Sequence, residues 1–178
     1  HKNLGDPDWE YYDRTYYALG YAFEHRLNDV WQFRQNLRYT KSDLSFQAIT
    51  VNSYIPSLAA FGYVVDDQGN TGRGTTNVEE DISQFAVDNN FQGDFSTGDV
   101  RHTLLIGLDH QRNNTNYLSI IGTAPGINVN TPQYGLPITR PPRSDAFYDQ
   151  DQKTYQTGLY VQDQMALDNW RLTLGGRE

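Results

Sequence analysis

The 178-residue chain contains no cysteine, so neither a disulfide framework nor a thiolate metal site is available to it. It has no run of about 18 apolar residues, which excludes a transmembrane helix. Basic residues are also few: 14 Lys and Arg against 22 Asp and Glu leave a formal charge of −8, which argues against a general nucleic-acid binder. Alternating membrane strands remain allowed, because hydropathy windows do not detect them.

Aromatic residues supply much of the hydrophobic area instead. The chain has 13 Tyr, 8 Phe and 3 Trp, and only 37% of its residues are hydrophobic. Large rings with polar tips suit surfaces that meet both an apolar phase and water. The composition therefore favours an amphipathic surface over a conventional aliphatic core.

Large apolar residues alternate with small or polar ones through "YYALGYAFEHRLNDVWQFRQNLRYT", residues 16–40. A strand sends alternate side chains to opposite faces, and Asn28-Asp29 is a turn pair by composition. The stretch therefore predicts an antiparallel hairpin with one apolar and one polar face. The same pattern recurs at 82–95, 100–111, 154–167 and 170–177, which gives six predicted strands. On the apolar face we expect the following mid-strand residues to contact lipid: Leu19, Phe33, Val87, Ile106, Val161 and Leu172.

The connections alternate between short turns, "LND", "STGD" and "LDN", and two long loops at about 49–81 and 113–153. Antiparallel order places both long loops at one end of the sheet. Short periplasmic turns and long extracellular loops are typical of outer-membrane barrels. The predicted fold class is all-β, with antiparallel up-and-down strands from a large transmembrane β-barrel.

Aromatic rings at both ends of the apolar faces are spaced as expected for strands that cross a membrane. Trp31 and Tyr39 are eight residues apart, which at about 3.3 Å per residue and a tilt of roughly 40° spans about 20 Å, close to the apolar band of such barrels, about 25 Å tall. The two predicted girdles are Phe23, Trp31, Phe95 and Trp170 on the turn side, and Tyr17, Tyr39, Phe85 and Tyr155 on the loop side. A soluble β-sandwich or propeller would also show the alternation, but it does not explain the paired rings and the one-sided loops.

The pieces "LGYAFEHRLNDVWQFRQNLRYTKSD", "QFAVDNNFQGDFSTGDVRHTLLIGLDHQR" and "QTGLYVQDQMALDNWRLTLGGRE" resemble barrel segments of TonB-dependent siderophore receptors, especially the ferrichrome and hydroxamate type. The resemblance implies a barrel of about 22 strands closed by an N-terminal plug. It also implies uptake of ferric siderophores across the outer membrane with energy from the TonB complex. Residues 1–178 are then interpreted as a fragment of the barrel domain, without the plug and the remaining strands, and six strands alone are not expected to close a barrel.

The same resemblance guides the choice of ligand-binding residues. Ligand-contacting aromatic positions of the ferrichrome-type receptor match Thr50, Asn52 and Ile121 here, so those rings are absent. Nearby loop aromatics are the candidates instead, with loop–loop packing as the alternative: Trp9, Tyr54, Phe61, Tyr63, Tyr117 and Tyr134. No cofactor is expected, because the siderophore carries its own iron ligands.

The remaining motifs are interpreted as structural rather than functional. His25, His102 and His110 are predicted to be interfacial rather than metal ligands. The turn 66–70 lacks calcium-loop spacing, and the glycine-rich 71–77 is predicted to be a flexible loop. "TRPPRSD", residues 139–145, is predicted to be a solvated loop, with contact to an acidic siderophore or to lipopolysaccharide phosphates as the alternative. No catalytic Ser, His and carboxylate grouping is recognisable, so an enzyme is not predicted.

The leading hypothesis is a receptor in the outer membrane that contacts a ferric siderophore, the TonB complex through an absent N-terminal region, lipid and lipopolysaccharide. Its alternatives are a passive porin-type channel and a soluble β-domain that binds carbohydrate or protein. The long loops carry tyrosines and amides but no dense basic cluster. An anionic catecholate complex requires basic groups at its entry, so a neutral or cationic hydroxamate complex is favoured.

Overall fold

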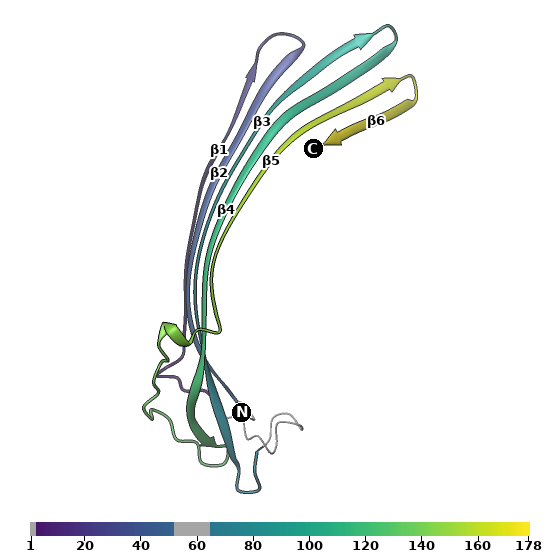
Figure 1. Cartoon of the computed structure of the whole chain (residues 1–178). Coiled ribbons are helices and arrows are strands. Elements are labelled where there is room, and N and C mark those ends of the chain that lie inside the picture. Colours follow the sequence, from purple (N-terminus) through teal and green to yellow (C-terminus); the bar gives the residue numbers. More distant parts are fainter. Residues whose placement is uncertain (1–2, 52–64) are drawn as a thin grey trace. The chain divides into compact units, whose positions relative to one another are not determined.

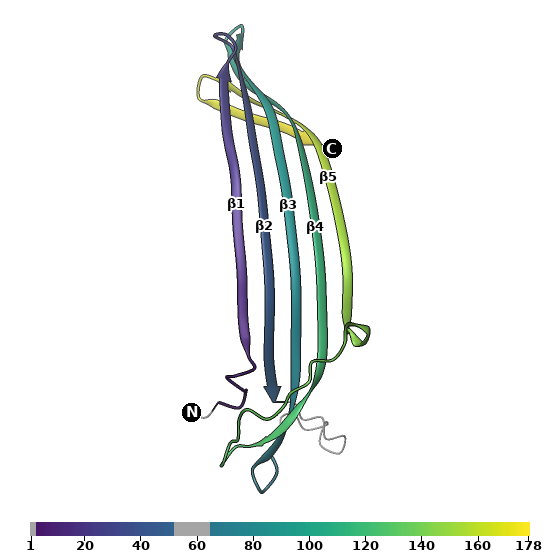
Figure 2. The same ribbon diagram turned by 90° about the vertical axis from the view of Figure 1, so that its left-hand side faces the viewer.

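The computed structural model describes residues 3–51 and 65–178. Six strands form one sheet in the order β1-β2-β3-β4-β5-β6, so each strand pairs with its neighbours in the sequence (Figures 1 and 2). Their bounds are β1 (Tyr11–Arg26), β2 (Trp31–Val51), β3 (Asn70–Thr97), β4 (Val100–Asn128), β5 (Tyr148–Leu167) and β6 (Trp170–Arg177). The predicted all-β, antiparallel architecture and the count of six strands are confirmed. Among the described residues, no helix is long and apolar enough to cross a membrane.

The chain divides into two compact units. The turn unit comprises Tyr17–Lys41, Ile82–Asn114 and Gln152–Glu178, and it contains the connections β1–β2, β3–β4 and β5–β6. The loop unit comprises His1–Tyr16, Ser42–Asp81 and Thr115–Asp151, and it contains the connections β2–β3 and β4–β5. Short and long connections are thus separated, as the sequence predicts.

Local chemistry explains why the connections of the turn unit are tight. The side chain of Asn28 accepts hydrogen bonds from the backbone N–H groups of Val30 and Trp31, at 2.9 and 2.8 Å. Gly98 and Asp168 take positive φ angles of 61° and 49° in the other two turns, a conformation that glycine adopts freely and that aspartate tolerates. The last turn sets a register in which Leu167 pairs with Trp170 and Val161 with Gly176.

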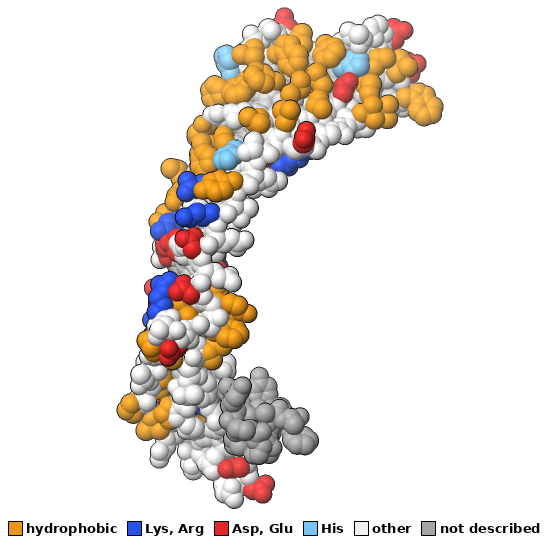
Figure 3. Space-filling view, in the orientation of Figure 1, with side chains coloured by type: hydrophobic (Ala, Val, Ile, Leu, Met, Phe, Trp, Pro, Cys, Tyr) orange, Lys and Arg blue, Asp and Glu red, His pale blue; other side chains and the backbone are white. Residues whose placement is uncertain are grey.

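The turn unit buries no hydrophobic side chain among its described residues. Every buried hydrophobic residue that the structure describes belongs to the loop unit: Ile49, Leu118, Ile120 and Ile127. Leu19 and Trp170 of the turn unit are 78% and 79% exposed, and hydrophobic side chains gather over the turn-bearing ends of its strands (Figure 3). A soluble sandwich would cover such a face with a second sheet. A sheet that leaves it open needs an apolar surrounding, as a bilayer provides.

The long strands make the loops shorter than the sequence indicates. Strand residues occupy parts of both predicted loops, 49–81 and 113–153: β2 continues to Val51, β3 begins at Asn70, β4 continues to Asn128 and β5 begins at Tyr148. The prediction of a flexible loop at 71–77 is wrong: this stretch is part of β3, and Thr71, Arg73, Thr75 and Asn77 are at most 4% exposed. Glycines and polar residues in this stretch gave no alternating pattern that would predict a strand. The strand forms because β4 pairs with it.

The turn at 66–70 has the structure expected of a turn rather than a calcium loop. The carboxylate of Asp66 accepts hydrogen bonds from the backbone N–H groups of Gln68 and Asn70 and from the Asn70 side chain. These bonds hold the pKa of Asp66 below its ordinary value of 3.8. The carboxylate is thus fully used in closing the turn that leads into β3.

Candidate functional site

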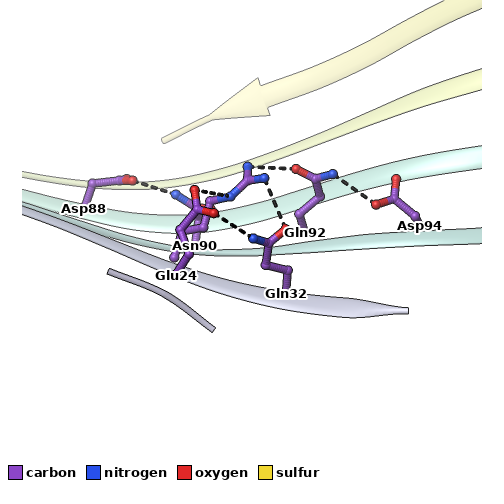
Figure 4. Close-up of polar contacts among 7 residues, drawn as sticks. Glu24, Gln32, Asp88, Asn90, Gln92 and Asp94 are labelled. Atoms are coloured by element: carbon purple, nitrogen blue, oxygen red, sulfur yellow. Dashed lines mark hydrogen bonds and ion pairs between the residues drawn. The ribbon is translucent and has the colours of Figure 1, made fainter. Parts of the chain in front are cut away.

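Hydrogen-bonded polar side chains form two groups on the polar face of the turn unit, one around Arg34 and one around Asp88. On β2, Arg34 Nη1 donates to Gln92 Oε1 of β3 at 2.8 Å and Nη2 to Gln32 Oε1 at 3.2 Å. Gln32 Nε2 in turn donates to the Glu24 carboxylate of β1 at 3.0 Å, and Arg34 Nε lies 3.3 Å from the same carboxylate as an ion pair. Glu24, Gln32 and Gln92 project from adjacent strands to one side of the sheet (Figure 4).

Further hydrogen bonds on this face run along β3 and across to the next strands. Asn90 donates to Asp88 and Gln92 to Asp94, at 2.7 and 3.0 Å (Figure 4). Thr103 of β4 donates to Asp94, and the Tyr160 hydroxyl of β5 donates to Asp88, both at 2.7 Å. Every member lies on the parity that the sequence predicts to be polar. Amides, carboxylates, hydroxyls and the Arg34 guanidinium thus gather on this face, which suits contact with water.

The opposite face is lined with rings. Phe23, Phe33 and Phe91 of β1, β2 and β3 form a row, with ring centroids 6.3 and 5.0 Å apart. This row crosses strands on the parity predicted to face lipid. Its ring planes are tilted to each other by 58° and 46°, between the stacked and edge-to-face arrangements.

Sequence reasoning missed a polar chain on this apolar face. The Tyr21 hydroxyl donates to Gln35 Oε1 at 2.5 Å, and Gln35 Nε2 donates to Asn89 Oδ1 at 2.6 Å. Gln35 lies midway between the girdle residues Trp31 and Tyr39 on the same strand. The available signal was the break in alternation, since Gln35 and Asn89 interrupt runs of apolar residues.

His102 and His110 contact side chains of neighbouring residues. His102 stacks on Phe95 at 5.0 Å, and its two ring nitrogens face Thr97 and Asp163 at 2.5 and 2.8 Å. His110 contacts Thr157 at 2.8 Å. Within the described ranges, no group of three or more His, Asp or Glu side chains is arranged to hold a metal ion.

The predicted ligand-binding aromatics have different outcomes in the structure. Tyr54, Phe61 and Tyr63 lie outside the described residues. Tyr117 was expected in a loop, but it is a half-buried residue within β4, because that strand continues to Asn128. It lines an open recess of about 480 Å³ together with Glu79, Asp81, Arg143 and Asp149.

Trp9 and Tyr134 belong to segments that the structure brings together. The Tyr134 hydroxyl donates to the backbone oxygen of Asn3 at 2.5 Å, and the Asp6 carboxylate accepts a hydrogen bond from Gly135 N at 2.9 Å. Trp9 is half-buried in the turn that follows Asp6, whereas Tyr134 is 39% exposed. Two predicted ligand residues 125 positions apart thus stand on contacting segments.

Net charge is concentrated in the loop unit. Its sequence ranges contain thirteen acidic and five basic residues, a formal charge of −8, whereas those of the turn unit contain nine of each. Two of its arginines are paired with acids, Arg140 with Glu79 and Arg143 with Asp149. The Arg143 guanidinium lowers the pKa of Asp149 below its ordinary value, and hydrogen bonding to Asp149 raises that of Arg143. The predicted solvated loop "TRPPRSD" therefore has its positive charge compensated by the protein.

Comparisons with known proteins agree on one family. The model of the TonB dependent receptor-like, beta-barrel family matches residues 2–178. The chain is 33% identical over 173 residues to the Ferrioxamine B receptor of Salmonella typhimurium and 32% identical over 191 residues to the Ferrichrome outer membrane transporter/phage receptor of Escherichia coli K12. These alignments cover 97% and 93% of this chain, but only 23% and 24% of the relatives.

Solved structures show the same fold at lower identity. The Ferric-Catecholate import receptor Fiu of Escherichia coli K12, in its closed form, superposes with a TM-score of 0.77 over 99% of this chain and 25% of its own, at 19% identity. The siderophore receptor PiuA of Acinetobacter baumannii gives a TM-score of 0.68 at 17% identity, over 98% of this chain and 26% of its own. The chain thus spans about a quarter of the relatives it matches. Its open amphipathic sheet, its separated turns and loops and the match over residues 2–178 show that it belongs to the TonB-dependent receptor β-barrel family, a family of outer-membrane receptors rather than enzymes.

Proposed function

We propose that this chain is part of an outer-membrane receptor that imports a ferric siderophore of the hydroxamate type with energy from the TonB complex. The observation that carries the proposal is the 33% identity, over nearly the whole chain, to a receptor named for ferrioxamine B. Ferrioxamine and ferrichrome, for which the similar sequences are named, are both ferric hydroxamates. The catecholate receptor among the solved structures supports the fold alone, at 19% identity.

The charge of the loop unit supports the same ligand class. The formal charge of −8 on the loop unit repels a strongly anionic catecholate complex and attracts a cationic complex. Its described basic side chains have partners on the protein, including Arg14 with Ser42 and Arg140 with Glu79. A neutral or cationic hydroxamate complex needs only aromatic walls and amide hydrogen bonds, which this unit supplies.

Uptake of iron-55 by cells that carry the full-length receptor tests the proposal. We expect uptake from ferric hydroxamates that is lost when TonB is deleted. Uptake from a catecholate and from no hydroxamate would overturn the ligand class. TonB-independent, non-saturable uptake would replace the receptor with the porin-type channel.

The recess around Tyr117 is the candidate ligand contact that the structure describes best. We expect Tyr117→Ala to weaken siderophore binding, because it removes the ring that lines the recess beside Glu79 and Asp149. Tyr148→Ala, which removes an exposed tyrosine of the same unit, is the control. Equal affinity for the Tyr117 variant and the parent receptor would assign Tyr117 to packing.

Lipid and lipopolysaccharide are the proposed surroundings of the apolar face. Arg112 lies 5.6 Å from the ring of Tyr155, a predicted loop-side girdle residue, where lipopolysaccharide phosphates would meet a cation. We expect Arg112→Ala to reduce the lipopolysaccharide that copurifies with the full receptor. Unchanged lipopolysaccharide content would remove Arg112 from this role.

A further inference from the structure

A buried arginine joins three parts of the loop unit. Arg73 of β3 is 4% exposed, and its Nε donates to the backbone oxygen of Pro125 in β4 at 2.7 Å. Its Nη1 donates to the backbone oxygens of Leu4 and Gly5, at 3.3 and 2.9 Å. We call residues 3–10, which precede β1, the N-segment. One guanidinium thus ties β3, β4 and the N-segment together.

The N-segment is also tied to the connection between β4 and β5. Asp6, 1% exposed, accepts a hydrogen bond from Gly135 N at 2.9 Å. The Tyr134 hydroxyl donates to the backbone oxygen of Asn3. On its other side, the carboxylate of Glu10 accepts hydrogen bonds from Ile49 N of β2 at 2.8 Å and from Asp6 N at 3.2 Å. The position of this short segment therefore depends on contacts from distant parts of the sequence.

Burial of the Arg73 side chain carries a free-energy cost that an apolar residue at this position would not have. The described residues place no carboxylate against it, and its charge is met by backbone carbonyls alone, while Nη2 is buried without a hydrogen-bond partner. Burial of a charge without a counter-ion is costly, and an apolar side chain would pack at lower cost. Only the planar fork of arginine reaches carbonyls on two separate segments in a fixed geometry. That geometry points to placement of the segments as the reason for the residue.

We propose that Arg73 is a positioning residue for ligand binding: it holds the N-segment in place, and through Asn3 and Asp6 it sets where Trp9 and Tyr134 stand. This inference rests on the proposed function, since it assigns Trp9 and Tyr134 to the siderophore pocket. The wall that they form is then built before the ligand arrives. A preformed wall avoids the entropy cost of ordering the segments on binding.

Substitutions in the full-length receptor test whether Arg73 affects siderophore affinity. We expect Arg73→Ala to weaken siderophore binding by about tenfold, while the amount of receptor in the outer membrane and the maximal uptake rate at saturating siderophore stay unchanged. Arg73→Lys should not rescue the loss, because a single ammonium cannot bridge the carbonyls of Pro125 and Gly5. The matched control is Arg14→Ala, which removes an exposed arginine of the same unit.

Tyr134→Phe is a milder variant that removes only the hydroxyl bonded to Asn3. If Arg73 and Tyr134 act through the same segment, the loss in the double variant should be smaller than the product of the single losses. If the losses of affinity multiply in the double variant, Arg73 and Tyr134 act independently. That result would overturn the proposal that both act through the N-segment.

A distance measurement separates this inference from the proposed function. Spin labels at Asp8→Cys and Gln133→Cys, in a full receptor with no other cysteine, should give a narrow distance distribution that broadens in Arg73→Ala without any ligand. An unchanged distribution overturns the inference even if siderophore uptake is normal. A broadened distribution with unchanged affinity in Arg73→Ala also overturns it, because the segments would move without consequence for binding. If the parent receptor takes up no siderophore, the proposed function fails, and the distance arm still decides whether Arg73 holds the segments.

Discussion

Glycines on the strands make room for large side chains from the neighbouring strand. A Cβ added at Gly107 of β4 would overlap the ring of Tyr160 on β5, and one added at Gly93 would meet the ring of Trp31 at 2.8 Å. Glycine weakens a strand by itself. Here the lost strand propensity is offset by a ring that packs against the glycine, and for Tyr160 also by the hydrogen bond from its hydroxyl to Asp88.

The first prediction tests the pair of Gly107 and Tyr160. Gly107→Ala should displace the Tyr160 ring and break its 2.7 Å hydrogen bond to Asp88, which costs about 1–3 kcal/mol for a half-buried polar pair. The free energy of unfolding of the full receptor, measured by urea titration in detergent, reports the loss. Gly176→Ala is the control, because a Cβ there meets nothing within 4 Å. Equal stability of the two variants would contradict the proposed packing.

The polar chain on the apolar face leads to a second prediction. Gln35→Leu should destabilise the receptor by about 1–3 kcal/mol, because it leaves the Tyr21 hydroxyl and the Asn89 carbonyl without partners in an apolar surrounding. The triple variant Tyr21→Phe, Gln35→Leu and Asn89→Leu should recover most of that loss, since no unpaired polar group remains. Urea titration in lipid vesicles measures both. A triple variant less stable than the single one would show that the chain has a further partner.

At the scale of the element, each strand of the turn unit presents two different environments. Val161 and Gln162 are adjacent on β5, and the predicted faces of the sheet place them on opposite sides. Val161 is 47% exposed and lies on the apolar parity, at a register position opposite Gly176. Gln162 lies on the same parity as Tyr160, which contributes to the polar network. Environment, rather than position along the strand, therefore sets the cost of a charge.

The third prediction compares arginine at these two positions. Val161→Arg should cost about 2–4 kcal/mol, the value for a cation near the bilayer midplane on a lipid-facing strand position. Gln162→Arg should cost far less, because its side chain meets water and polar groups. Folding titrations of the full receptor into lipid vesicles give both values. If the two substitutions cost the same, the assignment of faces is wrong.

At the scale of the whole molecule, net charge and hydrophobic burial differ between the two units. Among the described residues, the loop unit holds the buried hydrophobic side chains, and its sequence ranges carry the formal charge of −8, whereas the turn unit is neutral and leaves many of its large apolar side chains exposed. An open apolar face suits strands that cross a bilayer, and a charged unit suits contact with water. The field of an acidic surface acts chiefly on the association rate of charged ligands and is screened by salt.

The fourth prediction uses a ligand pair that differs only in charge. Ferrioxamine B carries a free amine, and its N-acetyl derivative keeps the same iron cage without the positive charge. At low ionic strength we expect the full receptor to bind the amine form with an association rate about tenfold higher or more. The difference should shrink as salt is added. Equal rates at all salt concentrations would show that the acidic field does not select the ligand.

Alternation along the chain was sufficient to predict the strands of the turn unit, because the two-residue period is a local property that both Phe33 and Arg34 report. It did not predict the strand at 70–81, where glycines and polar residues replace the alternation. The position of Tyr117 followed the same pattern: a loop by composition, it is a strand residue because β3 and β4 continue pairing.

The sequence by itself determined the all-β class, the count and faces of the strands, the sides of the short and long connections, and the resemblance to the receptor family. These properties depend on residues close together in the chain. Only the tertiary structure decided that Arg73 is buried against Leu4 and Pro125, that the segments of Trp9 and Tyr134 meet, and that Gln35 pairs with Asn89. Each of these contacts joins residues more than 50 positions apart, and their cost or gain depends on what surrounds them, which no local period encodes.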